Sequence, residues 1–406
     1  MANKTLLIKA VRANFIFIFF VLNGWMLPII ARAQHTDTTK LTVADIVIIH
    51  SKILNENRKI YIYNPNTDTI YFGPQPTPVL YLIDGDVHTA FVASQIQYLS
   101  KVYNDLPPML VVGISNYQYD RMRDLTPTHT LLDYFGTVDT SAQSPNRTTG
   151  GGEAFLRFVK EEVMPYIEQR YKTTSYKILS GHSLGGLMSL YCFSAHADWF
   201  NAYIAISPSL WWDNGRELKR ADTTLSNENI KNKKLFFSDG SEGNKFHNYV
   251  LSYDTLLRKK DLKGLTYKYI YYPDETHGSE PVKAEYDALK FIYAKWKPAA
   301  TDTTAALITK FYLQLSLEYG YNVLPDEPVI VTLAYQYVNT PDKLNDAIDL
   351  LEMNIKNHPA SYISYAVLGD AYLKKSDKKK AIVAYKKAIE LNPKDEDSKK
   401  KLKSLE

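Results

Sequence analysis

The feature that most constrains the fold of this chain is a series of short, strongly apolar runs separated by segments with a helical pattern. Continuous apolar runs of this length are typical of strands that are buried on both faces of a parallel sheet. Helical patterns at residues 152–171, 184–195 and 282–296 alternate with several of these runs. The alternation predicts an α/β fold, with a mostly parallel sheet covered by helices on both faces. The apolar runs are Val79–Ile83, Met109–Ile114, Tyr176–Ser180, Ala202–Ser207, Leu235–Ser238 and Tyr267–Tyr272.

Two more strands are expected ahead of these runs, and a second domain is expected after them. Residues 43–49 are rich in β-branched side chains, and residues 59–63 end at a turn-forming Asn-Pro-Asn sequence. The composition changes at residues 297–304, which indicates a linker. A length of 406 residues also favours two domains. The expected divisions are a first domain at 38–298, a linker or helical connection at 299–326, and a small all-α repeat domain at 327–406.

The last 80 residues contain an internal repeat with a period of 34, so that Ala347, for example, corresponds to Ala381. The pattern resembles the tetratricopeptide repeat, in which small residues let two helices approach and aromatic residues fill the space between them. The first copy is degraded, because Tyr335 stands where the repeat needs Gly and Asn354 where it needs Ala. We expect two repeats that pack on the first domain or on a neighbour, since at least three are usually needed for independent stability. The second copy carries Tyr365, Leu368, Gly369, Tyr372, Ala381, Tyr385, Ala388 and Pro393.

Residues 1–33 have the features of a signal peptide. Basic residues precede a largely apolar stretch at 15–30, and the small-x-small pattern that follows predicts cleavage after Ala33. A retained membrane anchor is the alternative, but Asn23 and Pro28 interrupt the stretch, which falls short of about 20 clean apolar residues. We therefore expect a secreted protein, periplasmic or extracellular, with no membrane span once the signal is removed.

Charge and cysteine content argue against several classes of function. The formal net charge is +4, from 48 basic and 44 acidic residues, and this is too small to indicate nucleic-acid binding. Cys192 is the only cysteine, so the chain has no intrachain disulfide and no multi-cysteine metal site. It lies in an apolar helical pattern, and we expect a buried core residue there.

The sequence Gly181-His182-Ser183-Leu184-Gly185 is a Gly-x-Ser-x-Gly motif. Such a motif alone is a weak signal, since it occurs by chance in roughly one chain in ten of this length. Here it directly follows an apolar strand and directly precedes a helical pattern, which is the setting of a nucleophile elbow. A strained turn of this kind has no room for side chains at the flanking positions. The context therefore predicts Ser183 as a catalytic nucleophile.

A serine nucleophile needs a base to take its proton and an acid to orient that base. In chains with this elbow the order is nucleophile, acid, histidine. His277 follows the last apolar run and is the expected base. The acid should follow the run at 235–238, where Glu242 and Asp239 compete. We favour Glu242, because it lies further from the strand end and is better placed to turn toward the histidine.

An acyl transfer also needs two backbone donors for the developing oxyanion. One is the amide of the residue after the nucleophile, here Leu184. The other comes from the loop after an early strand, where residues 79–83 end in Asp84-Gly85-Asp86. We assign it to the Asp86 amide, with Gly85 as the alternative. A plain β-turn is the competing interpretation of this Asp-Gly sequence.

Together these residues resemble the putative esterase family of α/β-hydrolases, which is esterase D-like and enterochelin-esterase-like. The resemblance runs from about residue 42 to residue 296, so it covers the whole first domain. It implies an α/β-hydrolase fold, with Ser183 and His277 at the catalytic positions. The acid position varies between Asp and Glu in the family, which leaves Glu242 and Asp239 both open. The matching segments are Tyr81–Gly85, Val112–Ile114, Arg123–Pro127, Gly181–Gly186, Ser207–Trp212 and Glu275–Ser279.

The same resemblance implies an activity but not a substrate. The family includes siderophore esterases, feruloyl and acetyl esterases acting on polysaccharides, thioester hydrolases and acyltransferases, and it uses no metal or organic cofactor. We therefore expect a secreted serine esterase that acts on a small-molecule or glycan-linked ester. The alternatives are an acyltransferase of the same fold and a protein in which the repeat domain carries the main role by binding a protein partner.

Four further side chains are candidates for substrate contact. Trp211 and Trp212 follow the strand after the nucleophile strand, and there they either stack on an aryl or sugar group or belong to the core. Arg121 either binds an anionic substrate or pairs with a neighbouring aspartate, and the ion pair is favoured. His88 is expected near the rim of the active site.

Overall fold

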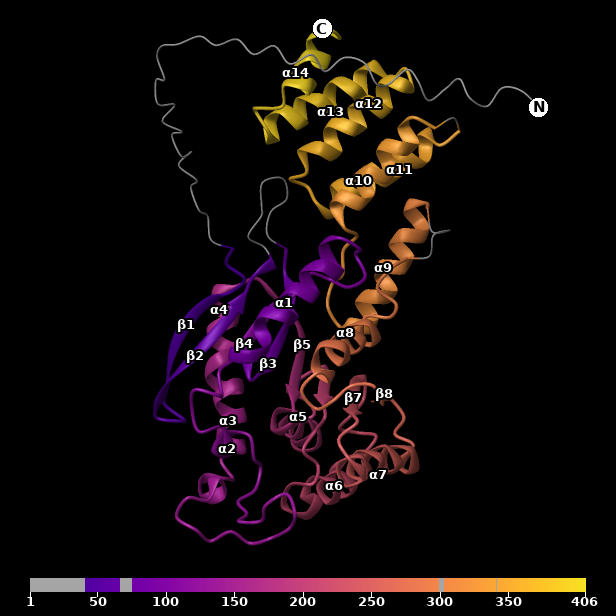
Figure 1. The fold of residues 1–406 in the computed structure, drawn as a ribbon. Coiled ribbons are helices and arrows are strands. Elements are labelled where there is room, and N and C mark those ends of the chain that lie inside the picture. Colours follow the sequence, from indigo (N-terminus) through magenta and orange to yellow (C-terminus); the bar gives the residue numbers. More distant parts are fainter. Residues whose placement is uncertain (1–40, 66–74, 299–302, 341) are drawn as a thin grey trace, which may run out of the picture. The chain divides into compact units, whose positions relative to one another are not determined.

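The computed structural model describes residues 41–65, 75–298, 303–340 and 342–406 (Figure 1). The segment predicted as a signal peptide, residues 1–33, lies outside the described residues. Within the described ranges, no helix combines the length and apolar character needed to cross a membrane.

One eight-stranded sheet organises the first part of the chain, in the order β1-β2-β4-β3-β5-β6-β7-β8. β1 and β2 pair antiparallel with each other, and β2 pairs antiparallel with β4. The pairs from β4 to β8 are parallel, which confirms the predicted α/β class. The strands are β1 (Asp45–Ser51), β2 (Glu56–Tyr63), β3 (Thr77–Ile83), β4 (Leu110–Ile114), β5 (Thr173–His182), β6 (Ala202–Ile206), β7 (Lys233–Gly240) and β8 (Leu265–Tyr272).

Helices cover both faces of this sheet. Successive side chains along a strand point to opposite faces, so each central strand contributes to an apolar cluster on either side. Along β3, Leu80 and Leu82 pack into an apolar cluster with α1 and α8. Val79 and Tyr81 face the other side and join a cluster with α3, α5, α6 and α7. Cys192 is fully buried in that second cluster, as expected. The helices are α1 (Gly85–Lys101), α2 (Arg121–Asp124), α3 (Gly152–Phe158), α4 (Met164–Arg170), α5 (Leu184–Ala195), α6 (Trp212–Thr224), α7 (Asn244–Lys260) and α8 (Glu280–Ile292).

The helix predicted at 152–171 is interrupted. A π-helical turn at Val159–Val163 separates α3 from α4. Pro165 lies in the first turn of α4 and has no N–H to donate to a carbonyl one turn earlier. The wider π turn accommodates this missing hydrogen bond, so the apolar period indicated the helix but not its break.

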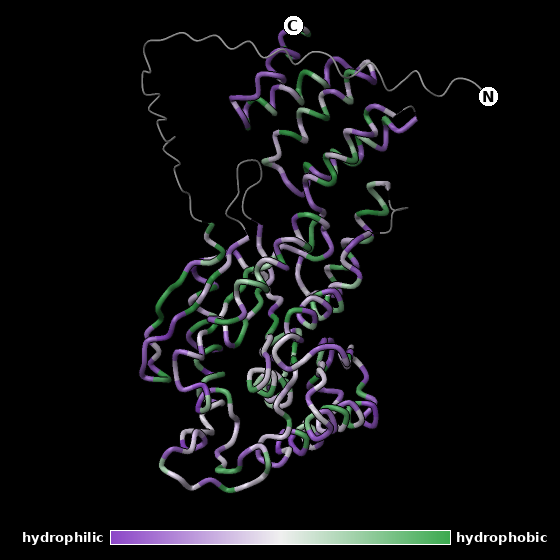
Figure 2. Tube along the Cα trace, in the orientation of Figure 1, coloured by the Kyte–Doolittle hydropathy of each residue, from purple (hydrophilic) through white to green (hydrophobic). Residues whose placement is uncertain are grey.

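The C-terminal part consists of helices, with α10–α11 and α12–α13 forming the two pairs expected for the repeats (Figure 1). Apolar and polar stretches alternate along these helices (Figure 2). Gly369 lets the second pair approach, since a Cβ there would lie 2.5 Å from the ring of Tyr385. The helices are α9 (Ala305–Tyr319), α10 (Glu327–Val338), α11 (Leu344–Asn357), α12 (Tyr362–Lys374), α13 (Lys378–Leu391) and α14 (Glu396–Lys403).

α9 joins the repeats to the sheet. It begins within the segment predicted as a linker or helical connection, and its last residue, Tyr319, is buried. The Tyr319 ring lies 5.2 Å from each of the rings of Tyr176 and Tyr293. One apolar cluster runs from this face of the sheet through α9 into the repeats, so the short array packs on the first domain.

Candidate active site

Ser183 occupies a strained turn between β5 and α5, with φ 61° and ψ −118°. Few residues other than Gly adopt a positive φ, and the conformation costs on the order of 1–3 kcal/mol. The neighbouring glycines make the turn sterically feasible. A Cβ on Gly181 would lie 2.3 Å from the carbonyl oxygen of Gly185, and a Cβ on Gly186 would lie 2.8 Å from the carbonyl oxygen of Ile206. The geometry is that of the predicted elbow.

The structure brings His277 to this turn, in the loop after β8. Its ring centroid lies 4.5 Å from that of His182, the residue immediately before Ser183. The Ser183 hydroxyl contacts Ser209 Oγ at 3.5 Å. Hydrogen bonds between a nucleophile and its base are often long in a protein without substrate and tighten when substrate binds. The side chain of His277 is 42% exposed, so solvent and substrate reach it.

Glu242, not Asp239, is the carboxylate at His277. Glu242 Oε2 lies 2.6 Å from His277 Nδ1. The loops after β7 and β8 are joined by a hydrogen bond from the Ser241 amide to the Glu275 carbonyl at 2.7 Å. This bond places the two side chains opposite each other. Asp239 is buried and instead binds a different histidine and a tyrosine on β8, at 2.6 and 2.7 Å.

The predicted oxyanion donors lie at the starts of two helices. Leu184 is the first residue of α5, and Gly85 and Asp86 are the first two residues of α1. Amides in a first helical turn have no intrahelical acceptor, and the helix dipole favours negative charge there. Asp84 precedes α1 in a left-handed conformation with φ 57°. Gly85 allows β4 to pass closely, because a Cβ there would lie 2.2 Å from the backbone of Gly113.

His88 does not lie on the rim as predicted. It is 8% exposed, and its ring packs 5.7 Å from that of His182. Burial lowers the pKa of His88 to about 4 and that of His182 to about 2, so both rings are neutral near pH 7. The His182 ring thus lies between those of His277 and His88, at 4.5 and 5.7 Å. The prediction placed His88 correctly in the region but misjudged its depth.

Arg121 forms an ion pair, the favoured of its two predicted alternatives, although with a different aspartate from the neighbouring ones that were expected. The guanidinium binds both carboxylate oxygens of Asp84, at 2.9 and 2.8 Å. The Arg121 side chain is only 19% exposed. Asp84 is the left-handed residue that directly precedes α1. The ion pair therefore holds the turn in which the Asp86 amide lies.

The two tryptophans have different environments. Trp212 is a core residue, 2% exposed, and its indole N–H donates to the carbonyl of Thr128. Of the two predicted alternatives, substrate contact or core, its burial favours the core. Trp211 is half-buried and lies edge-on to Tyr134 at 5.0 Å. The adjacent Phe135 is exposed. Trp211, Tyr134 and Phe135 together form an aromatic patch, to which the loop before α3 contributes Tyr134 and Phe135.

The sequence prediction missed two residues beside Glu242. Ser207 follows β6, and Glu280 begins α8; both are fully buried. The Ser207 hydroxyl contacts Glu242 and Glu280. Ser207 belongs to a segment that carries the family resemblance, but nothing in the sequence gives it a partner. Glu280 precedes a proline at a helix start. An acidic residue is common in the first turn of a helix, so the sequence gives no reason to single it out.

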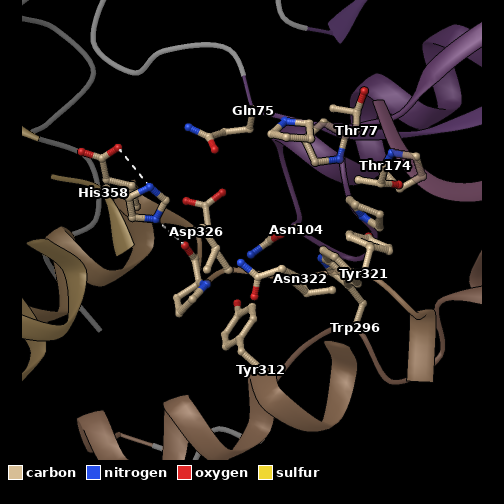
Figure 3. A pocket seen from close by; sticks show the side chains of 18 of the residues that line it. Gln75, Thr77, Asn104, Thr174, Trp296, Tyr312, Tyr321, Asn322, Asp326 and His358 are labelled. Atoms are coloured by element: carbon tan, nitrogen blue, oxygen red, sulfur yellow. Dashed lines mark hydrogen bonds and ion pairs between the residues drawn. The ribbon is translucent and has the colours of Figure 1, made fainter. Parts of the chain in front are cut away.

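A cavity of about 490 Å³ lies elsewhere, at the opposite edge of the sheet (Figure 3). Its walls include Thr77 and Thr174, near the amino ends of β3 and β5, together with Trp296, Tyr312 and Asp326. Ser183 lies at the carboxyl end of β5, which is where open α/β sheets place their ligands. The cavity is therefore separate from the chemistry at the elbow.

Comparison with protein families gives two matches. A model described as putative esterase matches residues 51–278, which is more than half of the chain. A tetratricopeptide repeat model matches residues 362–395, which confirms the second repeat.

Two curated relatives are siderophore esterases by name. The ferri-bacillibactin esterase BesA of Bacillus subtilis is 33% identical over 182 residues, which are 42% of this chain and 61% of that protein. The siderophore triacetylfusarinine C esterase of Aspergillus fumigatus is 30% identical over 150 residues, which are 35% of this chain and 47% of that protein. The chain thus spans only about half to three fifths of the length of these relatives.

Solved structures extend the likeness along the chain. An IroE-like serine hydrolase from Shewanella oneidensis is 27% identical, with a TM-score of 0.66 over 77% of this chain and 99% of that one. An uncharacterised protein from Capnocytophaga ochracea is 17% identical, with a TM-score of 0.57 over 89% of this chain and 99% of that one, a likeness of fold alone.

Proposed function

The chain belongs to the putative esterase family, and from that premise we propose that it is a serine esterase that hydrolyses carboxylic esters through an acyl-enzyme on Ser183. One observation carries the proposal. Ser183, with φ 61°, directly follows a residue whose ring lies 4.5 Å from that of His277, and His277 Nδ1 lies 2.6 Å from the buried carboxylate of Glu242. This is the arrangement that activates a hydroxyl for attack on an acyl carbon.

In the acylation step, His277 takes the proton of Ser183 as the oxygen attacks the ester carbonyl. Glu242 holds the imidazole by its Nδ1–H and stabilises the positive charge that the ring acquires. The ring then gives this proton to the leaving alcohol as the acyl–oxygen bond breaks. Water attacks the acyl-enzyme with the same histidine as base, which releases the acid and restores Ser183.

The negative oxygen of each tetrahedral intermediate needs donors that are already oriented. We assign the Leu184 amide and the Asp86 amide, with Gly85 as the alternative to Asp86. In support, these amides lie in the first turns of α5 and α1, and the Asp84–Arg121 ion pair holds the turn that precedes α1.

For the natural substrate we propose a siderophore-type ester. The names of the two curated relatives support this class. The aromatic patch of Trp211, Tyr134 and Phe135 supports an acyl group or scaffold with flat rings, because such rings stack on aromatic side chains. Acetyl or feruloyl esters are the second candidates. Acyl transfer differs only in the acceptor, because all steps up to the acyl-enzyme are shared.

We further propose that the mature protein is exported and that the repeats recruit a protein partner. Export is supported by the signal-like residues 1–33. Recruitment is supported by the tetratricopeptide match, since such repeats commonly present binding surfaces. The recruitment role is tested by removing the repeats. Unchanged ester turnover together with loss of a partner from pull-down experiments would support it.

The enzyme proposal is tested with the purified protein and its Ser183→Ala variant. Both are assayed on p-nitrophenyl acetate, p-nitrophenyl butyrate, a feruloyl ester and a catecholate siderophore ester. We expect turnover by the natural protein alone, fastest on the siderophore ester. Absence of turnover on every ester, with Ser183 unlabelled by a fluorophosphonate, would refute the proposal.

A further inference from the structure

Behind the triad acid lies a buried chain of polar groups that the acylation steps above do not use. Ser207 follows β6 with φ 42°, and its amide donates to the Ser238 carbonyl at 2.9 Å. Its hydroxyl oxygen lies in hydrogen-bonding contact with Glu242 Oε1 on one side and with Glu280 Oε2 on the other. Two carboxyl groups therefore share one serine hydroxyl.

The number of hydrogens determines what this contact requires. A serine hydroxyl has one hydrogen to donate and lone pairs to accept. An ionised carboxylate only accepts. If Glu242 and Glu280 were both ionised, the single hydrogen of Ser207 would serve one of them, and the other would face a lone pair. Both contacts are satisfied only when one carboxyl carries a proton and donates it to Ser207 Oγ.

The surroundings place this proton on Glu280. Glu242 accepts from His277 and must neutralise the imidazolium during catalysis, so it is the charged member. Glu280 is fully buried, and its Oε1 accepts no hydrogen bond of normal geometry among the described residues, although the Ser238 hydroxyl lies near it. An ionised oxygen in that position would be desolvated with little compensation.

We infer that Glu280 is a positioning residue of the proposed esterase: as a neutral carboxylic acid it donates to Ser207, which in turn donates to Glu242 and holds it against His277. The inference rests on the proposed function, because it assigns a task to Glu280 only if Glu242 and His277 work on Ser183. Glu280 touches neither substrate nor nucleophile. It acts through the geometry of Glu242.

Other charged groups around Glu280 agree with this proton. Burial is the largest cause that raises the pKa of Glu280, to about 7, and the charges of Glu242 and of Asp239 on β7 raise it further. The hydroxyls of Ser207 and Ser238 act in the opposite direction and are outweighed. Asp239 is itself bound to His247 on α7 and to Tyr269 on β8.

On the side of β8, Tyr272 lies close enough to Glu280 for an ionised Glu280 to raise its pKa, while its own hydroxyl donates to Asp287. Glu280 also stands in the first turn of α8, where the helix dipole favours a negative charge. That influence opposes the neutral form and is outweighed by burial and by the neighbouring carboxylates.

The arrangement makes activity depend on pH with a definite sign. Below about pH 7 Glu280 is neutral and the chain of donors is complete. As pH rises through that value, the carboxyl loses its proton and Ser207 has one hydrogen for two acceptors. Glu242 then loses its second donor, and kcat/KM falls by about tenfold on the alkaline side.

Glu280→Gln tests this dependence, because a glutamine amide stays neutral and still donates at every pH. The matched control is Glu285→Gln on the same helix. Glu285 is also buried, with a pKa raised to about 7, but its partner is Ser180 Oγ at 2.7 Å and not the triad acid. We expect Glu280→Gln to keep kcat/KM within about threefold of the natural protein at pH 6 and to lose the alkaline fall. Glu285→Gln should keep that fall, and Glu280→Ala should be slow at every pH because the donor is gone.

The rate of Ser183 labelling by a fluorophosphonate, followed over the same pH range, is the second measurement. A natural protein that reacts without an alkaline fall between pH 6 and 9 would overturn the inference whether or not any variant folds. So would a folded Glu280→Gln protein that keeps the fall or is slow at pH 6. A natural protein that neither hydrolyses esters nor becomes labelled would instead sink the proposed function, so the two failures are distinguishable.

Discussion

Replacing Glu242 by Gln removes a charge from the site while leaving its shape nearly unchanged. The carboxylate lies 2.6 Å from His277 Nδ1, which places the two charge centres about 4 Å apart. At that separation a pair of unit charges is worth about 4 kcal/mol at an effective dielectric constant of 20 and about 1 kcal/mol in water. The Glu242 side chain is 6% exposed and that of His277 is 42% exposed, so the interaction falls between these limits.

The imidazolium forms only as the reaction proceeds, so this loss affects the transition state and not the bound substrate. Since about 1.4 kcal/mol corresponds to a factor of ten, we expect Glu242→Gln to lower kcat about 100-fold with KM nearly unchanged. The assay is steady-state hydrolysis of p-nitrophenyl butyrate, with circular dichroism to show that the variant is folded.

Asp239→Asn is the matched control, since it makes the same chemical change at the competing carboxylate. Asp239 is buried and binds His247 and Tyr269, so its loss should cost about 1–3 kcal/mol of folding free energy while kcat stays within about threefold. A Glu242→Gln enzyme that stays within threefold of the natural protein, or a folded Asp239→Asn enzyme that loses more activity, would refute the assignment of the acid.

Three further outcomes are expected. Arg58→Met should destabilise the fold by about 3 kcal/mol in denaturant titrations, because it leaves Asp124, which lies 2.6 Å from the buried guanidinium, with less compensation; a loss below 1 kcal/mol would contradict this. Gly369→Ala should destabilise the repeats by about 1–3 kcal/mol, because its Cβ meets the Tyr385 ring, while kcat stays the same; a matching fall in kcat would show that the repeats control the site. Trp211→Ala should raise KM about tenfold for a feruloyl ester, whose acyl group is aromatic, but not for p-nitrophenyl acetate, whose acyl group is not; equal effects on both would remove the aromatic patch from binding of the acyl group.

The sequence predicts the sheet well, because the central strands β3, β4 and β6 are buried along their whole length and therefore appear as unbroken apolar runs. It also predicts the elbow, since only small residues fit around Ser183. The π turn before Pro165 was not predicted, because a local change from four to five residues per hydrogen-bonded turn leaves the apolar pattern intact.

The side-chain partners were harder to predict than the backbone. Arg121 was expected to meet a nearby aspartate or a substrate, but it meets Asp84, which the turn before α1 brings from 37 positions away. Trp212 and His88 were expected near the active site because each follows the end of a strand. The sequence does not show that packing buries both side chains. Nothing in the sequence singles out Glu280, because the residue that it contacts, Ser207, lies 73 positions away along the chain.

The most direct test of the proposed acyl-enzyme mechanism is to observe the acyl group on Ser183. The natural protein is mixed with p-nitrophenyl butyrate, quenched in acid within milliseconds, and digested for peptide mass mapping. We expect a burst of p-nitrophenol equal to the enzyme concentration and a peptide heavier by one butyryl group at Ser183, with neither in the Ser183→Ala variant. An acyl group on another residue, or hydrolysis that persists in that variant, would contradict it.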